Sequence, residues 1–209
     1  MRNRLDVLFY HKMINFIAKA IPRFLLKKIG ALLFKIVMVY LFLYTLFTKE
    51  KRERLIEYKW ILKRMNKGSL CLDVGCGDSL LGYILVSHFP LYLSIDIKIY
   101  PIIAINPEIN FIKADITHAP FKSNLFNTII CISTLEHINN YVTAIYEMSR
   151  ILKNRGKLHI SVPSDILPCT DEELIQILQN YKMTVIENIK VHLSKNRELY
   201  MISLRKNDK

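Results

Sequence analysis

The pattern of apolar and polar residues changes at Gly68. After this residue, short apolar runs alternate with stretches whose apolar residues follow helical spacing, which predicts strands connected by crossover helices. Strands are expected at residues 69–74, 91–97, 109–114, 126–133, 157–162, 183–192 and 198–205. Helices are expected at 79–88, 139–152 and 171–181, the last opened by the capping box Thr170-Asp-Glu-Glu173. The fold class is therefore α/β, with a seven-stranded, mostly parallel sheet and helices on both faces.

The N-terminal residues show a different pattern. Residues 5–20 place apolar side chains on one face of a helix, while basic side chains lie mostly elsewhere. Residues 29–48 form an apolar run with Lys35 as its only charge, long enough to cross a hydrocarbon core of about 30 Å. Basic residues flank this run on both sides, whereas the positive-inside rule requires asymmetry, so helices lying on a membrane surface are favoured. A helical cap packed on the following domain and a true membrane span are the alternatives.

A charged helix follows at about residues 49–65, and Asn66-Lys67-Gly68 is a typical stop signal. We place the boundary near Lys59. This gives a basic, hydrophobic helical region at 1–59, acting on a membrane surface or as a lid, and an α/β domain at 60–209.

The charge of the chain is unevenly distributed. The net charge is +12 over 209 residues, yet residues 1–60 hold 13 Lys and Arg against 4 Asp and Glu, whereas residues 61–209 hold 17 against 14. Because the excess is N-terminal, we do not expect a nucleic-acid partner. The four cysteines form no C-x-x-C pair, which predicts reduced thiols and no metal site. The expected location is the cytoplasm, with peripheral attachment to the inner face of the membrane through residues 1–48.

Glycines and acidic residues mark the ends of three expected strands. Asp73, Gly75 and Gly77 end the first strand, where glycines let the backbone turn tightly and approach a cofactor. Asp96 ends the second strand, where an acid can accept hydrogen bonds from both ribose hydroxyls, and Asp115 ends the third. Parallel strands bring their carboxyl ends to one crevice, so these residues are expected to converge. Taken singly, a tight turn or a solvated loop carboxylate explains each of them.

Ordered blocks over about residues 69–163 resemble the small-molecule type of class I, Rossmann-like S-adenosylmethionine-dependent methyltransferases. The blocks are Leu72-Asp-Val-Gly-Cys-Gly77, Ser94-Ile-Asp-Ile97, Ala114-Asp-Ile116, Ala119-Pro-Phe-Lys-Ser-Asn-Leu-Phe126, Ser133-Thr-Leu-Glu-His-Ile138 and Ser149-Arg-Ile-Leu-Lys-Asn-Arg-Gly156. The resemblance implies the seven-stranded fold of that family and S-adenosyl-L-methionine as the cofactor.

The resemblance also assigns roles to the acidic and glycine residues. It implies that Asp73, Gly75 and Gly77 hold the methionine portion of the cofactor, directly or through water. Asp96 is then expected to bind the ribose, and Asp115 to accept a hydrogen bond from the exocyclic amine of the adenine.

Four further residues receive roles from the same resemblance. Ile97 and Ile116 are expected to sandwich the adenine, and Ser133 and Thr134 to line the floor beneath the methyl group. Ser79 departs from the family pattern, because many relatives carry a third glycine there.

The implied activity is methyl transfer by in-line displacement to a small-molecule or lipid-like acceptor, and residues 1–48 motivate the lipid-like option. A general base is optional. His137 is the candidate because an imidazole with a near-neutral pKa accepts protons readily, although a structural histidine at a helix start is the alternative. Other readings are a non-catalytic S-adenosylmethionine-binding module tethered to a membrane or partner, and a nicotinamide enzyme, which the missing third glycine and Asp115 argue against. The acceptor atom and the oligomeric state are left open.

Overall fold

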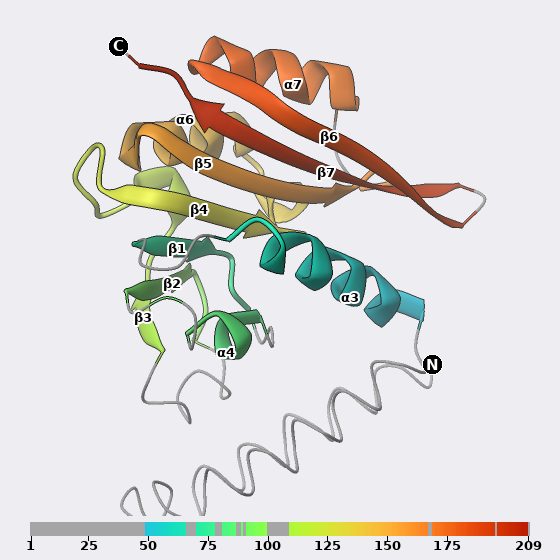
Figure 1. The fold of residues 1–209 in the computed structure, drawn as a ribbon, viewed down its shortest axis with the longest axis horizontal. Coiled ribbons are helices and arrows are strands. Elements are labelled where there is room, and N and C mark those ends of the chain that lie inside the picture. Colours follow the sequence, from blue (N-terminus) through green and yellow to red (C-terminus); the bar gives the residue numbers. More distant parts are fainter. Residues whose placement is uncertain are drawn as a thin grey trace, which may run out of the picture.

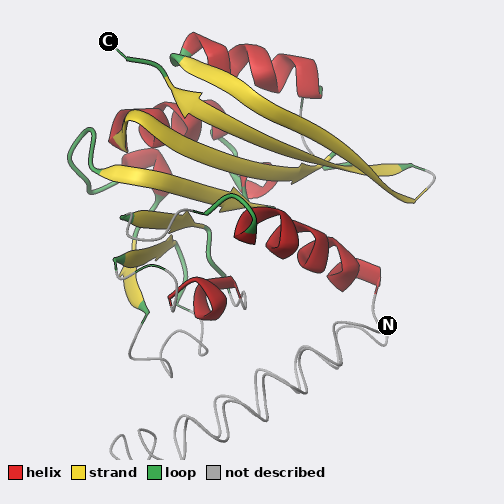
Figure 2. Cartoon of the chain, in the orientation of Figure 1, coloured by secondary structure: helices red, strands yellow, loops and turns green. Residues whose placement is uncertain are grey.

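The computed structural model describes residues 49–65, 70–77, 81–86, 89, 91–99, 109–166, 169–194 and 196–208. Within this part of the chain, helices lie on both faces of one mixed sheet (Figure 1), and the strands of that sheet occupy the middle layer (Figure 2). The N-terminal segments predicted before Lys49 lie outside the described residues.

The strands of the sheet hydrogen-bond in the order β3-β2-β1-β4-β5-β7-β6. Their bounds are β1 Cys71–Val74, β2 Tyr92–Asp96, β3 Asn110–Lys113, β4 Phe126–Ile132, β5 Leu152–Pro163, β6 Met183–Ser194 and β7 Arg197–Lys206. The first five strands are parallel, whereas β7 runs antiparallel to both β5 and β6. The expected seven-stranded, mostly parallel sheet is confirmed, and β1 to β5 end at one common edge.

Both faces of the sheet are buried because successive side chains of a strand point to opposite sides. In β4, Ile129 and Cys131 belong to one apolar cluster, and Ile130 and Ile132 belong to the other. The first cluster contains the buried residues of α6 (Tyr141–Ile151) and α7 (Asp171–Asn180), and the second contains those of α3 (Lys49–Leu62) and α4 (Leu81–Val86). This two-sided burial holds the parallel strands in a fixed register.

Helix α3 is packed onto the sheet. Its Trp60 and Ile61 are buried, and the Trp60 indole donates a hydrogen bond to Glu187 of β6 at 3.2 Å. Arg64, just beyond the helix, donates from Nη2 to the same carboxylate at 2.5 Å. The boundary expected near Lys59 therefore falls inside a helix that packs on the α/β domain. No helix in the described ranges is long and apolar enough to cross a membrane.

Two local details test the expected element bounds. The capping box is present, since the Thr170 hydroxyl accepts from the Glu173 N–H at 3.2 Å and the Glu173 carboxylate accepts from the Thr170 N–H at 2.8 Å. In contrast, β5 begins at Leu152 rather than at residue 157. Leu152 pairs with Phe126, and the register then shifts, with Arg155 at a φ of 60°. This irregularity explains why the sequence pattern did not predict a strand at residues 152–156.

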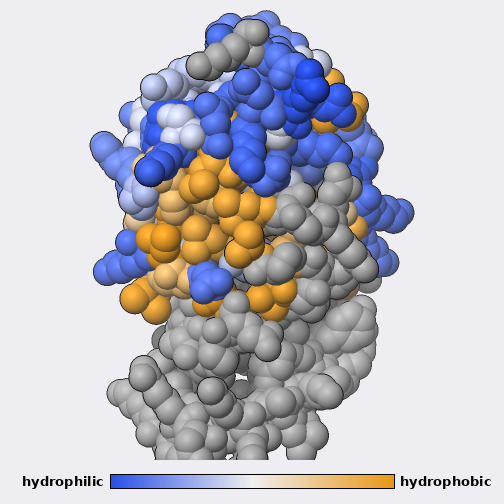
Figure 3. Space-filling model, turned by 60° about the vertical axis from the view of Figure 1, so that its left-hand side comes forward, coloured by the Kyte–Doolittle hydropathy of each residue, from blue (hydrophilic) through white to orange (hydrophobic). Residues whose placement is uncertain are grey.

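The described surface is divided into polar and apolar regions. Figure 3 shows hydrophilic residues gathered at the top of the molecule and apolar residues gathered below them. Three large apolar side chains flank β2 and are more than half exposed, Leu91 at 59%, Ile97 at 59% and Ile99 at 60%. The carboxyl end of β2 therefore presents apolar side chains next to the charged Asp96.

Candidate functional site

The turn after β1 lies against the ends of its neighbouring strands. Gly75 and Gly77 adopt φ values of 68° and 53°, a region that costs a glycine little because it has no Cβ. The Gly75 N–H donates to the Ile95 carbonyl of β2 at 2.8 Å. A Cβ on Gly75 would lie 2.0 Å from Cγ2 of Thr134, which follows β4. Glycine is thus required where three strands meet.

Asp96 fixes the position of this turn. One carboxylate oxygen accepts from the Gly77 N–H at 2.9 Å, and the other accepts from the Lys98 N–H at 3.0 Å. The structure thereby brings together the glycine motif and the acid that ends β2, as the motif spacing predicts. Each oxygen keeps a further lone pair for a ligand hydroxyl.

Asp73 is held below the turn. Its side chain is buried, and the Tyr92 hydroxyl at the start of β2 donates to Oδ2. Burial raises the pKa of Asp73 to about 7, while the Tyr92 hydrogen bond lowers it and the charge of Asp96 raises it. Tyr92 could not be identified from the sequence, because tyrosine is an ordinary residue of strands.

The three residues expected around the adenine lie in different environments. Asp115 is exposed and accepts from the Thr117 N–H at 2.9 Å, which caps the short helix η1 (Ile116–His118). Ile116 is 5% exposed and packs in the core, whereas Ile97 is open to solvent. Ile97 is therefore available for contact with a planar ring, whereas Ile116 is buried in the core.

The exit of β4 touches the glycine turn. Thr134 donates from its hydroxyl to the carbonyl oxygens of Gly75 at 3.2 Å and Ile132 at 3.0 Å. Ser133 is buried, has a φ of 42°, and its N–H donates to the Ser161 carbonyl at 2.9 Å. Such left-handed conformations of non-glycine residues are concentrated at functional sites. The expected floor residues thus lie where β1, β4 and β5 end.

Glu57 of α3 covers this floor. Its side chain is fully buried, and Oε1 accepts from the Ser133 hydroxyl at 2.6 Å and from the Ser161 hydroxyl at 2.5 Å. Its Oε2 accepts from Arg54 at 3.1 Å. Glu57 is a residue that sequence reasoning missed, because an acid in a helix rich in Lys, Arg and Glu looks like part of a solvated face.

Two titratable residues follow β4 in the short helix η2 (Leu135–His137). The side chain of His137 is 67% exposed, and its Nε2 lies 4.0 Å from Oε1 of Glu136. The Glu136 side chain is only 1% exposed, and among the described residues its Oε2 has no hydrogen-bond partner. Burial, as the largest cause, raises the pKa of Glu136 to about 7. The buried acid beside the expected histidine is thus a titratable group with a perturbed pKa at the exit of β4.

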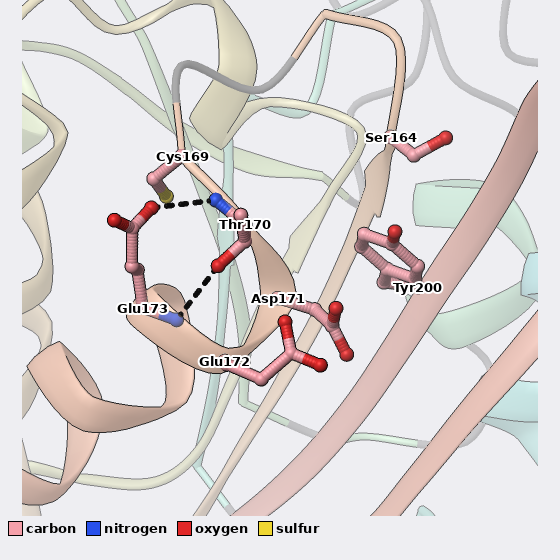
Figure 4. Close-up of a pocket in the computed structure, with 7 residues that line it drawn as sticks. All are labelled: Ser164, Cys169, Thr170, Asp171, Glu172, Glu173 and Tyr200. Atoms are coloured by element: carbon pink, nitrogen blue, oxygen red, sulfur yellow. Dashed lines mark hydrogen bonds between the residues drawn. The ribbon is translucent and has the colours of Figure 1, made fainter.

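A second polar region lies beyond the end of β5. A cavity of about 580 Å³ is lined by Ser164, Cys169, Thr170, Asp171, Glu172, Glu173 and Tyr200 (Figure 4). Its acids already have partners, because Glu173 belongs to the capping box and Asp171 accepts from Lys190 at 2.8 Å. The same ammonium group lies 5.2 Å from the centre of the Tyr200 ring. Glu172 lies 4.0 Å from the same Lys190 ammonium group, so one described cation is shared by two of the three acids.

Comparisons with known proteins agree with the geometry. Residues 72–160 match the family model of a methyltransferase domain. An uncharacterized protein of Methanocaldococcus jannaschii is 37% identical over 108 residues, which are 51% of this chain and 47% of that protein. The matching region thus spans about half the length of this relative.

Solved structures share the fold. The N-methyltransferase NodS of Bradyrhizobium japonicum, in complex with S-adenosyl-L-homocysteine, has a TM-score of 0.64 at 19% identity, over 76% of this chain and 88% of that one. The 1,6-didemethyltoxoflavin-N1-methyltransferase of Burkholderia thailandensis has a TM-score of 0.62 at 17% identity, over 72% and 76%. The [4+2]-cyclase SpnF has a TM-score of 0.66 at 16% identity, over 77% and 82%. Because a cyclase shares it, this fold alone does not decide the reaction.

Proposed function

We propose that this chain, whose residues 72–160 are a methyltransferase domain of the class I, S-adenosylmethionine-dependent family, transfers a methyl group to a small-molecule acceptor. The observation that carries the proposal is the meeting of three strand ends at Gly75. The glycine turn accepts a hydrogen bond from Thr134 of the β4 exit and donates one to Asp96 of β2. Residues that are as far apart in the chain as Gly75 and Thr134 thus meet at one edge of the sheet.

The residues at this edge fit S-adenosylmethionine. Within the described part of the chain, a Cβ on Gly77 would have the Gly75 carbonyl oxygen, at 3.9 Å, as its nearest neighbour, which leaves room for a ligand to approach the backbone. We assign the ribose to Asp96 and the methionine portion to the turn of Gly75 and Gly77, with Asp73 acting from below. We assign the two faces of the adenine to Ile97, which is exposed, and Ile116, which is 5% exposed, and its exocyclic amine to Asp115.

The cofactor supplies a sulfonium methyl group that is already activated for transfer. The chain therefore has to position a nucleophile in line with that group and to exclude water. Ser133 and Thr134 form the floor, and α3 lies over it through Glu57. We place the acceptor at the edge where β4 and β5 end, beside the contact of Glu57 with Ser133 and Ser161. The exposed imidazole of His137 is the proton acceptor suggested by the sequence, for acceptors that lose a proton.

The basic, apolar segment at residues 1–48 supports a finer proposal, that the acceptor is lipid-like and reached from a membrane surface. Flotation of the full-length chain with anionic and zwitterionic vesicles tests this attachment. We expect salt-sensitive binding to anionic vesicles that is lost when residues 1–48 are deleted. If the full-length chain and the chain without residues 1–48 both stay in the unbound fraction, membrane attachment is rejected. The proposal of methyl transfer is not affected by that result.

The cofactor is tested by calorimetric titration with S-adenosylmethionine and with NADH. Asp96→Ala should weaken S-adenosylmethionine binding by about 10- to 100-fold, the affinity equivalent of a hydrogen bond to a charged group. Asp208→Ala is the matched control, because Asp208 pairs with Arg155 at the surface. A preference for NADH would contradict the proposal. If S-adenosylmethionine binds but no methyl group is transferred to any component of a cell extract, a non-catalytic binding module is favoured.

A further inference from the structure

The hydroxyl groups of Ser133 and Ser161 share one acceptor on α3. Ser133 follows β4, Ser161 lies in β5, and both hydroxyls donate to Oε1 of Glu57, at 2.6 Å and 2.5 Å. The Ser133 N–H donates in turn to the Ser161 hydroxyl oxygen at 3.1 Å. These three hydrogen bonds form a closed ring. Because a carboxylate accepts hydrogen bonds and donates none, the ring fixes the direction of both hydroxyl groups.

The backbone conformation of Ser133 depends on such contacts. Its φ of 42° lies in the left-handed region, which is unfavourable for a residue with a Cβ. A conformation of this kind persists where the surrounding structure over-determines it. The Ser133 N–H donates to the carbonyl and the hydroxyl oxygen of Ser161, and the Ser133 hydroxyl donates to Glu57. Ser161 thus holds the backbone of Ser133, and Glu57 holds its side chain.

Helix α3 has anchors on the sheet that do not involve Glu57. Trp60 and Arg64 both donate to Glu187 of β6, at 3.2 Å and 2.5 Å. Trp60 is itself buried in the apolar cluster on that face of the sheet. A fully buried charge adds little to such docking, because removing it from water costs free energy that its contacts must first repay. Docking of α3 alone therefore does not explain why an acid is buried at position 57.

We propose that Glu57 is a positioning residue for methyl transfer, which holds the Ser133 hydroxyl in place in the floor beneath the methyl group of the cofactor. This inference rests on the proposed function, which assigns Ser133 and Thr134 to that floor. The floor is then complete only when α3 lies on the sheet. Small displacements at a reacting centre lower the rate of transfer, so a helix that precedes every strand takes part in aligning the reaction.

The expected effect of Glu57→Gln follows from the donors on either side of this side chain. Arg54 donates to Oε2 at 3.1 Å and has no acceptor, so the amide oxygen of the glutamine should face Arg54 and its N–H₂ group the serine hydroxyls. An N–H···O hydrogen bond is about 2.9 Å long, whereas the Ser133 hydroxyl lies 2.6 Å from Glu57. The Ser133 hydroxyl should therefore reverse its direction and move away by roughly 0.3 Å.

The experiment uses the full-length chain saturated with S-adenosylmethionine that carries ¹³C in its transferable methyl group. The methyl resonance in a ¹³C–¹H correlation spectrum reports the groups beside that carbon. We expect Glu57→Gln to displace this resonance by more than its line width, while the calorimetric affinity for S-adenosylmethionine changes less than twofold. Glu187→Gln is the matched control, because it weakens an anchor of α3 on β6 and should leave the resonance in place.

Ser133→Ala tests whether the effect passes through this hydroxyl. The variant removes the group that Glu57 holds, so it should displace the methyl resonance by itself. Adding Glu57→Gln to Ser133→Ala should then cause little further displacement, because coupled residues are not additive. Two fully additive displacements would mean that Glu57 affects the methyl group by another route, and this result would overturn the inference.

The outcomes separate this inference from the proposed function. If S-adenosylmethionine does not bind to the wild-type chain, the proposed function fails. If it binds, but the resonance stays in place in Glu57→Gln or moves equally in Glu187→Gln, Glu57 has a structural role and only the positioning inference is overturned. Should Glu57→Gln not fold, Ser133→Ala still decides. An unchanged resonance in that variant means that the Ser133 hydroxyl does not lie beside the methyl group.

Discussion

The cofactor half of the domain, β1 to β3 with their loops, differs from the acceptor half, α3 with β4 to β7, in the range of its contacts. In the cofactor half, the hydrogen bonds from Gly77 to Asp96 and from Tyr92 to Asp73 each join residues 19 positions apart. In the acceptor half, Glu57 joins Ser133 over 76 positions and Ser161 over 104. The hydrogen bonds of the cofactor half form within the single connection from β1 to β2. Those of the acceptor half need α3, which precedes every strand of the sheet in the chain.

This difference separates binding of the cofactor from choice of the acceptor. The glycine turn and Asp96 are backbone-centred contacts, so they tolerate few changes. The contacts of Glu57 with Ser133, Ser161 and Arg54 are made by side chains, each of which can be substituted without changing the backbone of the turn. Substitutions in the two halves should therefore have separable effects on stability and on affinity for S-adenosylmethionine.

The largest effect is expected from Gly75→Ala in the cofactor half. The new Cβ would lie 2.0 Å from Thr134 Cγ2, and the backbone φ of 68° is itself unfavourable for alanine. Overpacking and left-handed strain together should cost about 3 kcal/mol of unfolding free energy, measured by urea denaturation.

Gly77→Ala is the matched control for this steric argument. It shares a positive φ of 53°, but among the described residues its Cβ would meet only the Gly75 carbonyl oxygen, at 3.9 Å. We expect a loss of about 1 kcal/mol in stability, from strain alone, with weaker S-adenosylmethionine binding. Equal destabilisation by both alanines would show that Thr134 moves aside and that the β4 exit is not rigid.

The next effect belongs to the acceptor half. Glu57→Gln removes the charge that Arg54 pairs with and leaves an amide N–H₂ facing hydroxyl groups. Because Glu57 is fully buried while the Arg54 side chain is 40% exposed, we expect a loss of about 2 kcal/mol in urea denaturation. Affinity for S-adenosylmethionine should change less than twofold. Asp208→Asn, at the exposed pair with Arg155, should stay within about 0.5 kcal/mol.

The contrast also explains what the sequence could predict. The strand bounds and the meeting of Gly77 with Asp96 follow from apolar runs and a short motif, because both are local in the chain. Glu57 could not be found in this way, since nothing distinguishes it from Glu53 in the same charged helix. Glu136 was visible only as the neighbour of His137. Its raised pKa comes first from burial in the folded chain, which no local pattern encodes.

A pH-dependent effect is expected from Asp73 in the cofactor half. Burial raises the pKa of Asp73 from 3.8 to about 7, so the folded chain holds a proton that the unfolded chain releases between these values. The stabilising contribution is therefore complete below about pH 4 and is lost as the pH rises through 7. The slope is at most about 1.4 kcal/mol per pH unit for one proton.

Asp73→Asn should remove this slope, as measured by urea denaturation from pH 5 to 8. The difference between variant and wild type is the useful quantity, because other groups also titrate. Glu136 acts with the same sign as Asp73, whereas burial lowers the pKa of His159 to about 4, so that residue adds stability as the pH rises. An unchanged slope in Asp73→Asn would place the proton elsewhere and assign a charged Asp73 to the folded state.

The smallest expected change in stability comes from Ile97→Ala, which separates cofactor contact from folding within the cofactor half. Ile97 is 59% exposed, so its truncation should alter the unfolding free energy by less than about 0.5 kcal/mol. If its side chain covers the adenine, the loss of apolar contact should weaken S-adenosylmethionine binding by about fivefold, close to 1 kcal/mol by calorimetry. Ile186→Ala is the matched control, because Ile186 is 49% exposed on β6, in the acceptor half, and should leave the affinity unchanged. If the wild type and Ile97→Ala bind S-adenosylmethionine with equal affinity, Ile97 does not contact the adenine. The proposed cofactor site then rests on Asp96 and the glycine turn.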